Sequence, residues 1–312
     1  MQVSLTYLVG SSGRPTPQGV LMARSSRLVK PAQQGLIHLT VIRTERLSEH
    51  WMRVTLGGGE IEKFQPLGYD QWFRLFLPLG GEEGLERLPA KANQMLGYLR
   101  YLRIPEGVRP IMRNYTVRAY RPANAPAGTG AEIDVDFVLH ATPEDGTAGP
   151  ASRWAQTCSP GESVVIIDEG LAFNPEHGVD NVLLVADETG LPAVAGICES
   201  LPSTATGLAL IEVPSAEDAL AFGRPDGVEI RWIIRPDHET KPGSLALAAL
   251  RALPAISPTV HAFIVGEQSL PTMARRYLVS ERGIPKEAVS FTGYWRTGAA
   301  SPTPKAQATT AN

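Results

Sequence analysis

Residues 182–201, VLLVADETGLPAVAGICESL, decide the fold of the C-terminal half of the chain. A continuous apolar run at 182–186 is followed by a polar turn and then by residues 192–201, which have the composition of a helix. The alternation continues with apolar runs at 208–213, 228–234 and 260–265 and with helical segments at 217–222, 244–253 and 271–282. Apolar strands that alternate with helices predict a parallel sheet covered on both faces.

The chain before residue 170 has a different pattern, in which short strand-like runs are separated by glycine and proline. These runs are IHLTVIR (37–43), WMRVTL (51–56), WFRLFL (72–77), TVRAY (116–120), IDVDFVLH (133–140) and VVII (164–167). Short strands divided by such turns predict an antiparallel barrel. One helical insertion is expected at 92–102, where apolar residues recur at helical spacing.

The two patterns predict a β-barrel domain followed by an α/β domain with a parallel sheet. We expect the barrel at 36–172 and the α/β domain at 181–298, because Asn, Pro and Gly cluster between them. Residues 1–35 and 299–312 have no hydrophobic periodicity, and we expect them to form a disordered leader and tail.

Composition excludes several classes of protein. The 312 residues include 29 Lys+Arg and 32 Asp+Glu, a balance that argues against a nucleic-acid binder. No apolar stretch approaches the roughly 18 residues of a membrane helix, and no secretory signal is present, so we expect a cytoplasmic protein without membrane insertion. Two cysteines, Cys158 and Cys198, are too few for a disulfide framework or a cysteine-ligated cluster.

The first candidate site is Arg113-Asn114-Tyr115-Thr116. These residue types suit a bound flavin, because an Arg can pair with a pyrophosphate, a Tyr can lie against the ring system and a Thr can hydrogen-bond the ring edge. The alternative is an ordinary strand with a core Tyr and a solvated Arg.

The second candidate site begins at Gly149, where a Gly-Pro turn leads into Ala151 and Ser152 at the start of an expected helix. Backbone N–H groups at such a helix start can cradle a phosphate. His140, at the end of the preceding strand, is expected to contact the cofactor or, alternatively, to be a capped strand-end imidazole.

The third candidate site is the turn after the strand at 182–186. A nicotinamide dinucleotide is expected outside the carboxyl end of such a strand. The turn lacks the GxGxxG pattern, and Asp187 and Glu188 place negative charge there; the alternative is that two acids favour a helix N-terminus. Glu212, at the end of the next strand, is positioned to accept from a ribose 2′-hydroxyl and so favours NADH over NADPH.

Taken together, these segments resemble the siderophore-interacting proteins, FAD-dependent ferric-siderophore reductases related to the ferredoxin–NADP reductase group. The resemblance covers roughly residues 36–298. It rests on RNYTVR (113–118), DFVLH (136–140), GPASRWA (149–155), PGESVVI (160–166), ADETGLPA (186–193) and GYWRTG (293–298).

The resemblance implies a set of cofactor-binding residues. For FAD they are Arg113, Asn114, Tyr115, Thr116, Val138, Leu139, His140, Gly149, Ala151 and Ser152. For the nicotinamide side they are Asp187, Glu188, Thr189, Leu191, Pro192, Gly266 and Glu267. Trp295 lies in a C-terminal aromatic segment near the flavin, and we expect that segment to pack at the domain interface.

The resemblance also implies a substrate and a reaction. Anionic ferric siderophores call for basic residues, and the candidates are Arg74, Arg118 and Arg153; each could instead be solvated or structurally paired. We expect NADH or NADPH to pass a hydride to the flavin, and single electrons then to reduce siderophore-bound Fe(III), which releases Fe(II). No metal ligand, general acid or nucleophile is expected. The alternatives are an NAD(P)H flavin reductase, a non-catalytic flavin-containing siderophore-binding protein and a cofactor-free structural protein.

Overall fold

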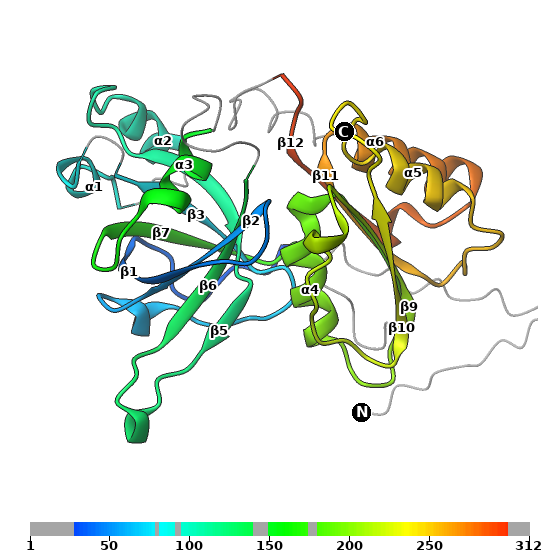
Figure 1. Cartoon of the computed structure of the whole chain (residues 1–312), viewed down its shortest axis with the longest axis horizontal. Coiled ribbons are helices and arrows are strands. Elements are labelled where there is room, and N and C mark those ends of the chain that lie inside the picture. Colours follow the sequence, from blue (N-terminus) through cyan, green and yellow to red (C-terminus); the bar gives the residue numbers. More distant parts are fainter. Residues whose placement is uncertain (1–27, 79–80, 91–94, 140–148, 174–179, 299–312) are drawn as a thin grey trace, which may run out of the picture.

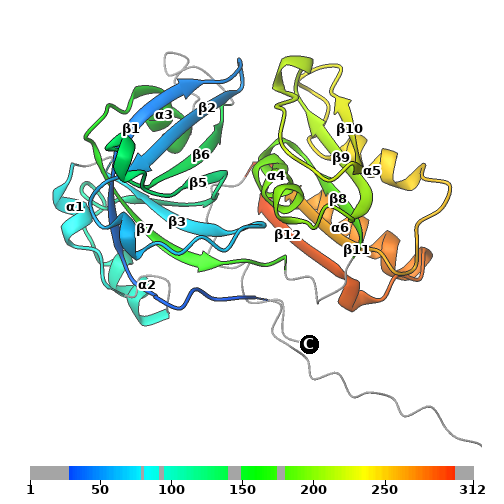
Figure 2. The same cartoon turned by 90° about the horizontal axis from the view of Figure 1, so that it is seen from below.

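The computed structural model describes residues 28–78, 81–90, 95–139, 149–173 and 180–298. These residues form two lobes that lie side by side, a mainly β lobe (the β-lobe) followed by an α/β lobe (Figures 1 and 2). Among the described residues, no helix is long and apolar enough to cross a membrane.

The first lobe is a curled antiparallel sheet in the order β4-β3-β7-β1-β2-β6-β5. Its strands are β1 (Ile37–Arg46), β2 (Trp51–Gly57), β3 (Trp72–Leu77), β4 (Ile111–Thr116), β5 (Ala119–Arg121), β6 (Glu132–Val138) and β7 (Ser163–Gly170). Alternate side chains, among them Leu75, Phe137 and Ile166, point inward and form one apolar core. The predicted antiparallel barrel is confirmed as a half-barrel.

The expected strand at 116–120 is instead two strands. The Val117 N–H donates to the Gln71 carbonyl, and the Arg118 N–H donates to the Asp134 carbonyl. The chain therefore changes partner between these two residues, from the loop before β3 to β6. Within the sheet β4 pairs with β3 alone, because it is an edge strand.

Three helices accompany this sheet: α1 (Glu83–Glu86), α2 (Met95–Leu102) and α3 (Pro150–Thr157). The helical insertion is confirmed from residue 95, and residues 92–94 lie outside the described residues. Tyr101 of α2 packs on Phe76, whereas Leu96 is 73% exposed. The leucines that mark the helical period therefore face outward, and the tyrosines face the core.

The second lobe is a parallel sheet in the order β10-β9-β8-β11-β12. Its strands are β8 (Asn181–Ala186), β9 (Thr206–Val213), β10 (Gly227–Ile234), β11 (His261–Glu267) and β12 (Val289–Trp295). The helices are α4 (Leu191–Ser200), α5 (Ser244–Arg251) and α6 (Ser269–Arg276). α4 packs on one face of the sheet and α5 with α6 on the other, so the predicted parallel sheet covered on both faces is confirmed.

Two elements of this lobe differ from the sequence expectation. The expected helix at 217–222 is only a short 3₁₀ turn, Ala216–Asp218, and the Asp218 carboxylate accepts from Ser48 and His50 of the other lobe. The expected helix at 271–282 begins at Ser269, ends at Arg276 and continues as a π-helical turn, Tyr277–Glu281. The sequence patterns also do not predict β12.

The expected disordered leader is wrong at its C-terminal end. Val29 and Leu171 exchange two backbone hydrogen bonds of 3.0 Å, and Lys30 pairs with Glu169 at 2.6 Å. Ordered chain therefore begins before residue 36. Residues 1–27 and 299–312 lie outside the described residues.

The two lobes pack closely against one another. Trp51 of β2 is fully buried in the core of the α/β lobe. Asp218 of the α/β lobe accepts from Ser48 at 2.6 Å and from His50 at 2.8 Å, both on the β-lobe. A Cβ on Gly196 would lie 2.1 Å from the Tyr69 carbonyl oxygen, so only glycine at this position of α4 lets that loop approach.

Candidate functional site

Arg113 on β4 is a half-buried cation without an acidic partner. Its guanidinium donates to the Met112 carbonyl at 2.8 Å, and it makes no ion pair within the described residues. Burial lowers the pKa of the guanidinium. A desolvated charge held in this way is prepared to receive an anion.

The start of α3, a helix that contacts β4, also suits an anion. Gly149 is the N-cap, no side chain caps the first amides, and Pro150 occupies the first turn. α3 packs against β4, β2 and β6, and its Trp154 ring lies 5.7 Å from Phe137. Free amides at a helix start and an unpaired Arg nearby are the donor set that a pyrophosphate needs, so FAD fits these residues.

The side chains that follow Arg113 lead to the interface between the lobes. Tyr115 is half-buried, with its ring 4.3 Å from that of Phe137, and Asn114 is exposed. The Thr116 hydroxyl hydrogen-bonds Tyr294 of β12, whose pKa is raised by burial. The end of β12 therefore reaches the flavin motif, as expected for a segment that packs at the interface.

The end of β6 lies on the same side of the β-lobe. The buried Leu139 donates its N–H to the His50 carbonyl at 2.8 Å, and the half-buried Val138 packs against the α/β core. Ala151 and Ser152 of α3 are buried. His140 lies outside the described residues.

On the nicotinamide side, both acids of the turn after β8 are buried and used internally. The Asp187 carboxylate accepts from the Thr189 N–H at 2.9 Å and from the Glu267 N–H at 2.6 Å. Glu188 forms a two-pronged ion pair with Arg235 at 2.7 and 2.9 Å. Burial, followed by the charge of Glu188, raises the pKa of Asp187.

The rest of this turn leads into α4. Thr189 is half-buried, and its hydroxyl donates to Asp187 at 2.6 Å. Leu191 and Pro192 are buried in the first turn of α4, where proline is favoured.

Glu267 at the end of β11 holds the C-terminal segment. It accepts from the N–H and hydroxyl of Ser269, pairs with Lys241 at 3.2 Å and receives the Thr297 N–H at 3.3 Å. Although burial opposes it, hydrogen bonds from Ser269 lower the pKa of Glu267 to about 2. The Trp295 indole N–H donates to Asp187 at 3.2 Å, so two acids fix the end of β12.

Glu212, expected to accept from a ribose hydroxyl, has partners within the α/β lobe. Its carboxylate accepts from three backbone N–H groups at the start of α5, those of Gly243, Leu245 and Ala246, each at 2.9 Å. Arg235 lies 3.2 Å away, and Glu212 is fully buried. The carboxylate on which the expected NADH preference rests is therefore committed to the start of α5 and to Arg235.

The three basic residues expected at the substrate side differ in availability. Arg74 pairs with the buried Glu169 at 2.7 Å. Arg118 forms a two-pronged ion pair with Glu199 at 2.9 and 3.1 Å across the lobe interface. Arg153 is exposed on α3 and makes no ion pair within the described residues.

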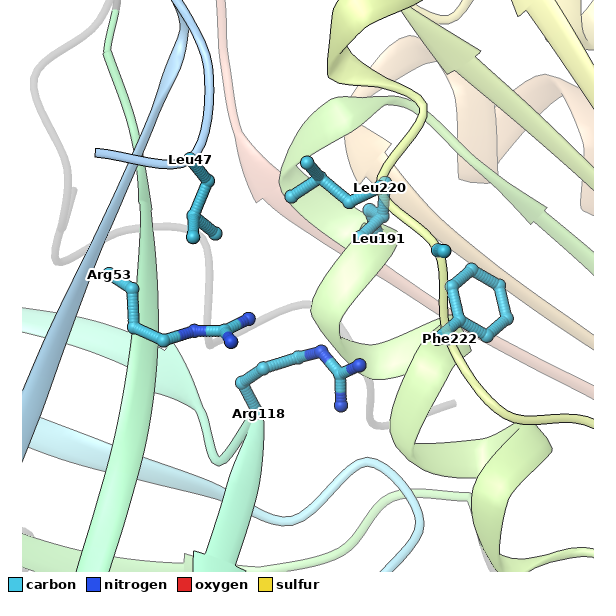
Figure 3. A pocket seen from close by; sticks show the side chains of 7 residues that line it. Leu47, Arg53, Arg118, Leu191, Leu220 and Phe222 are labelled. Carbon is cyan, nitrogen blue, oxygen red and sulfur yellow. The ribbon is translucent and has the colours of Figure 1, made fainter. Parts of the chain in front are cut away.

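A cavity of about 150 Å³ lies between the lobes (Figure 3). Arg53 and Arg118 extend from the β-lobe toward α4, and the opposite wall is apolar. Its lining residues are Leu47, Arg53, Arg118, Leu191, Leu220, Ala221 and Phe222. The cavity brings one expected substrate residue and one expected nicotinamide residue together. It is smaller than the roughly 300 Å³ of a typical ligand pocket, so it suits part of a ligand.

The cysteines are buried thiols. Burial raises the pKa of both Cys158 and Cys198 to about 12. Within the described part of the chain, no three His, Cys, Asp or Glu side chains gather where they could hold a metal ion.

Comparison with known proteins identifies the family. A model described as siderophore-interacting FAD-binding domain matches residues 40–172, and one described as siderophore-interacting protein matches residues 179–298. An uncharacterized protein of Mycobacterium tuberculosis is 33% identical over 267 residues, which cover 83% of this chain and 89% of that protein. This chain belongs to the siderophore-interacting protein family.

Two further relatives extend over nearly the whole siderophore-interacting protein. The NADPH-dependent ferric-chelate reductase of Escherichia coli is 28% identical over 263 residues, covering 82% of this chain and 91% of that protein. The crystal structure of a siderophore utilization protein from T. fusca has a TM-score of 0.69 at 29% identity, covering 88% of this chain and 97% of that one. The family resemblance inferred from the sequence is confirmed.

One residue of this siderophore-interacting protein that the sequence reasoning missed is Arg235. It follows β10 directly, as Glu188 follows shortly after β8 and as Glu212 nears the end of β9. The carboxyl ends of parallel strands meet at one edge of the sheet. The position of these three residues at or just after strand ends was therefore a signal in the sequence that they lie close together.

Proposed function

We propose that this siderophore-interacting protein is an FAD-dependent ferric-siderophore reductase that takes electrons from a nicotinamide nucleotide and releases Fe(II). The single observation that carries the proposal is Arg113, a half-buried cation that makes no ion pair within the described residues and lies on a strand that contacts the uncapped helix α3. The names of the family models and of the ferric-chelate reductase relative support the same reaction. A cytoplasmic location is part of the proposal, because nicotinamide nucleotides are available there.

The proposed binding residues follow from the donor groups and surfaces described above. Arg113 and the first amides of α3 hold the pyrophosphate of FAD, with Ser152 beside them. Tyr115, Thr116, Val138 and Leu139 shape the surface for the ring system. In this assignment residues 36–172 are the FAD-binding domain and residues 181–298 the nicotinamide-side domain.

In the proposed reaction the flavin transfers the electrons, and the protein binds and orients the reactants. A bound flavin accepts two electrons as a hydride and gives them up one at a time, which a nicotinamide cannot do for Fe(III). The protein binds and orients both reactants and attracts the anionic chelate. Arg153, which makes no ion pair within the described residues, is assigned that last role, whereas Arg74 and Arg118 would have to leave Glu169 and Glu199 to bind the substrate. Fe(II) binds hard oxygen chelators far more weakly than Fe(III), so reduction releases the iron.

An anaerobic spectrum tests the proposal. The purified protein is loaded with FAD and mixed with NADH, then in a separate sample with NADPH, and a ferric siderophore is added with a chromogenic Fe(II) chelator. We expect the flavin bands to bleach with a nucleotide, to return with the ferric siderophore, and the Fe(II) complex to appear in step.

Other outcomes decide between the alternatives. Bleaching without any effect of the ferric siderophore, but with rapid reduction of free flavin, would favour a flavin reductase. Flavin bands that neither nucleotide bleaches would favour a flavin-containing siderophore-binding protein. The buried acids after β8 support this alternative, because their negative charge opposes the binding of a nucleotide phosphate. Failure to bind FAD at all would refute the assignment of Arg113.

A further inference from the structure

The carboxyl edge of the parallel sheet is lined by buried acids. Asp187, Glu188, Glu212 and Glu267 are each no more than 2% exposed. The cations paired with them in the described part of the chain are Arg235 and Lys241. Four carboxylates therefore share two cations at the edge where an α/β sheet ordinarily receives a negatively charged dinucleotide.

Asp187 also occupies the backbone groups that a dinucleotide phosphate would use. In such sheets the pyrophosphate binds the N–H groups of the turn after the strand and of the following helix start. Here the Thr189 N–H and the Glu267 N–H both donate to the Asp187 carboxylate, at 2.9 and 2.6 Å. The first N–H group lies in the turn after β8 and the second at the end of the adjacent strand β11. The Asp187 carboxylate therefore joins the two segments that follow these strands.

Gly266 is the residue that lets the two loops close around this carboxylate. Its φ is +131°, and a Cβ there would lie 2.6 Å from the Asp187 carboxylate carbon. The Trp295 indole N–H adds a further donor at 3.2 Å. The enclosure is complete enough that Asp187 is fully buried, so an incoming phosphate meets a filled anion site.

Arg235, an arginine at this edge, is also bound by internal partners. Its guanidinium is held by Glu188 at 2.7 and 2.9 Å and by Glu212 at 3.2 Å, and its side chain is only 8% exposed. Three of its five N–H donors are therefore used by two carboxylates, which also neutralise the charge that would attract the 2′-phosphate that distinguishes NADPH from NADH.

We propose that this edge excludes the pyrophosphate and adenylate of the electron donor, which is recognised through its nicotinamide–ribose half alone. The inference rests on the proposed function, because it describes how that reductase takes its donor. It follows that reduced nicotinamide mononucleotide, which lacks the adenylate half, works as well as NADH, and that NADPH has no advantage over either.

The first test compares the three donors on the FAD-loaded wild-type protein. We expect their kcat/KM values for flavin reduction to agree within about tenfold, whereas an enzyme that uses phosphate contacts loses about 100-fold or more when they are removed. A mononucleotide more than about tenfold worse than NADH would overturn the inference.

The second test measures binding without turnover, by calorimetric titration with ADP-ribose. Wild-type protein should bind it at least about tenfold more weakly than Asp187→Gly, since the variant frees the Thr189 and Glu267 amides for phosphate. Asp70→Asn is the matched control, because Asp70 is another buried carboxylate that accepts backbone N–H groups but lies outside this edge. The control should bind ADP-ribose as weakly as the wild type.

The two proposals fail in different ways. If no nucleotide reduces the flavin, the donor half of the proposed function is wrong, and the titration still decides the inference. The inference would be overturned if the wild type bound ADP-ribose as tightly as Asp187→Gly does. It would also be overturned if Asp187→Gly and Asp70→Asn raised the affinity for ADP-ribose equally. If Asp187→Gly does not fold, the donor comparison on the wild type decides alone.

Discussion

Arg113 should reduce the stability of the empty protein while it tightens the binding of FAD. Its guanidinium is half-buried and burial lowers its pKa, yet no carboxylate within the described residues compensates its charge. Arg53 provides the contrast, because it forms a two-pronged ion pair at 2.7 and 2.8 Å with the fully buried carboxylate of Asp136. The same substitution at these two positions should therefore have opposite effects on stability.

The magnitudes follow from these surroundings. Arg113→Met removes a desolvated charge and one carbonyl hydrogen bond, so the free energy of unfolding of the apoprotein should rise by about 0–1 kcal/mol. The loss of charge-assisted hydrogen bonds to the pyrophosphate should weaken FAD binding by about 1.5–3 kcal/mol, or about 10- to 150-fold in Kd. Arg53→Met leaves Asp136 buried without its partner and should cost about 3–5 kcal/mol.

Urea unfolding of the apoproteins measures the first quantity, and quenching of flavin fluorescence during titration with FAD measures the second. The apo form is required because bound FAD would itself stabilise the fold. The reasoning is refuted if Arg113→Met unfolds as early as Arg53→Met, or if its Kd for FAD equals that of the wild type.

Three further predictions follow from buried groups. Glu212→Gln should lower the free energy of unfolding by about 1.5–3 kcal/mol in urea denaturation, because the start of α5 loses a buried carboxylate and Arg235 keeps only Glu188. A changed ratio of NADH to NADPH activity in that variant, with stability intact, would instead support a role in ribose recognition. Burial raises the pKa of Asp70 from 3.8 to about 6. The native state thus holds this proton more tightly than the unfolded state, and the contribution of Asp70 to stability should fall by about 2 kcal/mol as pH rises from about 4 to 6. Urea unfolding across that range should show a smaller fall in Asp70→Asn, and an equal fall would contradict the assignment. The native thiols of Cys158 and Cys198, with pKa values raised to about 12, should resist Ellman's reagent at pH 8 until denaturant is added; fast labelling of either would show that it is accessible.

The sequence by itself determined the order and type of the two lobes. Periodicity is a local property, so alternating residues such as those at 133–138 and the continuous apolar run at 182–186 indicate half-buried and fully buried strands without knowledge of their partners. The motif residues are local in the same sense. Arg113 to Thr116 lie together on β4, and Gly149 to Ser152 form one helix start, so their placement followed directly from the spacing.

The tertiary structure alone decided which charges are available. The sequence around a carboxylate at a strand end does not show whether the carboxylate faces a ribose or caps a helix. Glu212 caps α5 because the fold brings residues 243–246 to it. Asp187 likewise is enclosed by β11 and β12, elements about 80 and 108 residues away along the chain. Partners at such separations are set by packing between elements, and local sequence carries no record of them. For this reason the family could be inferred from local motifs in the sequence, whereas the electrostatics at the end of β8 could not.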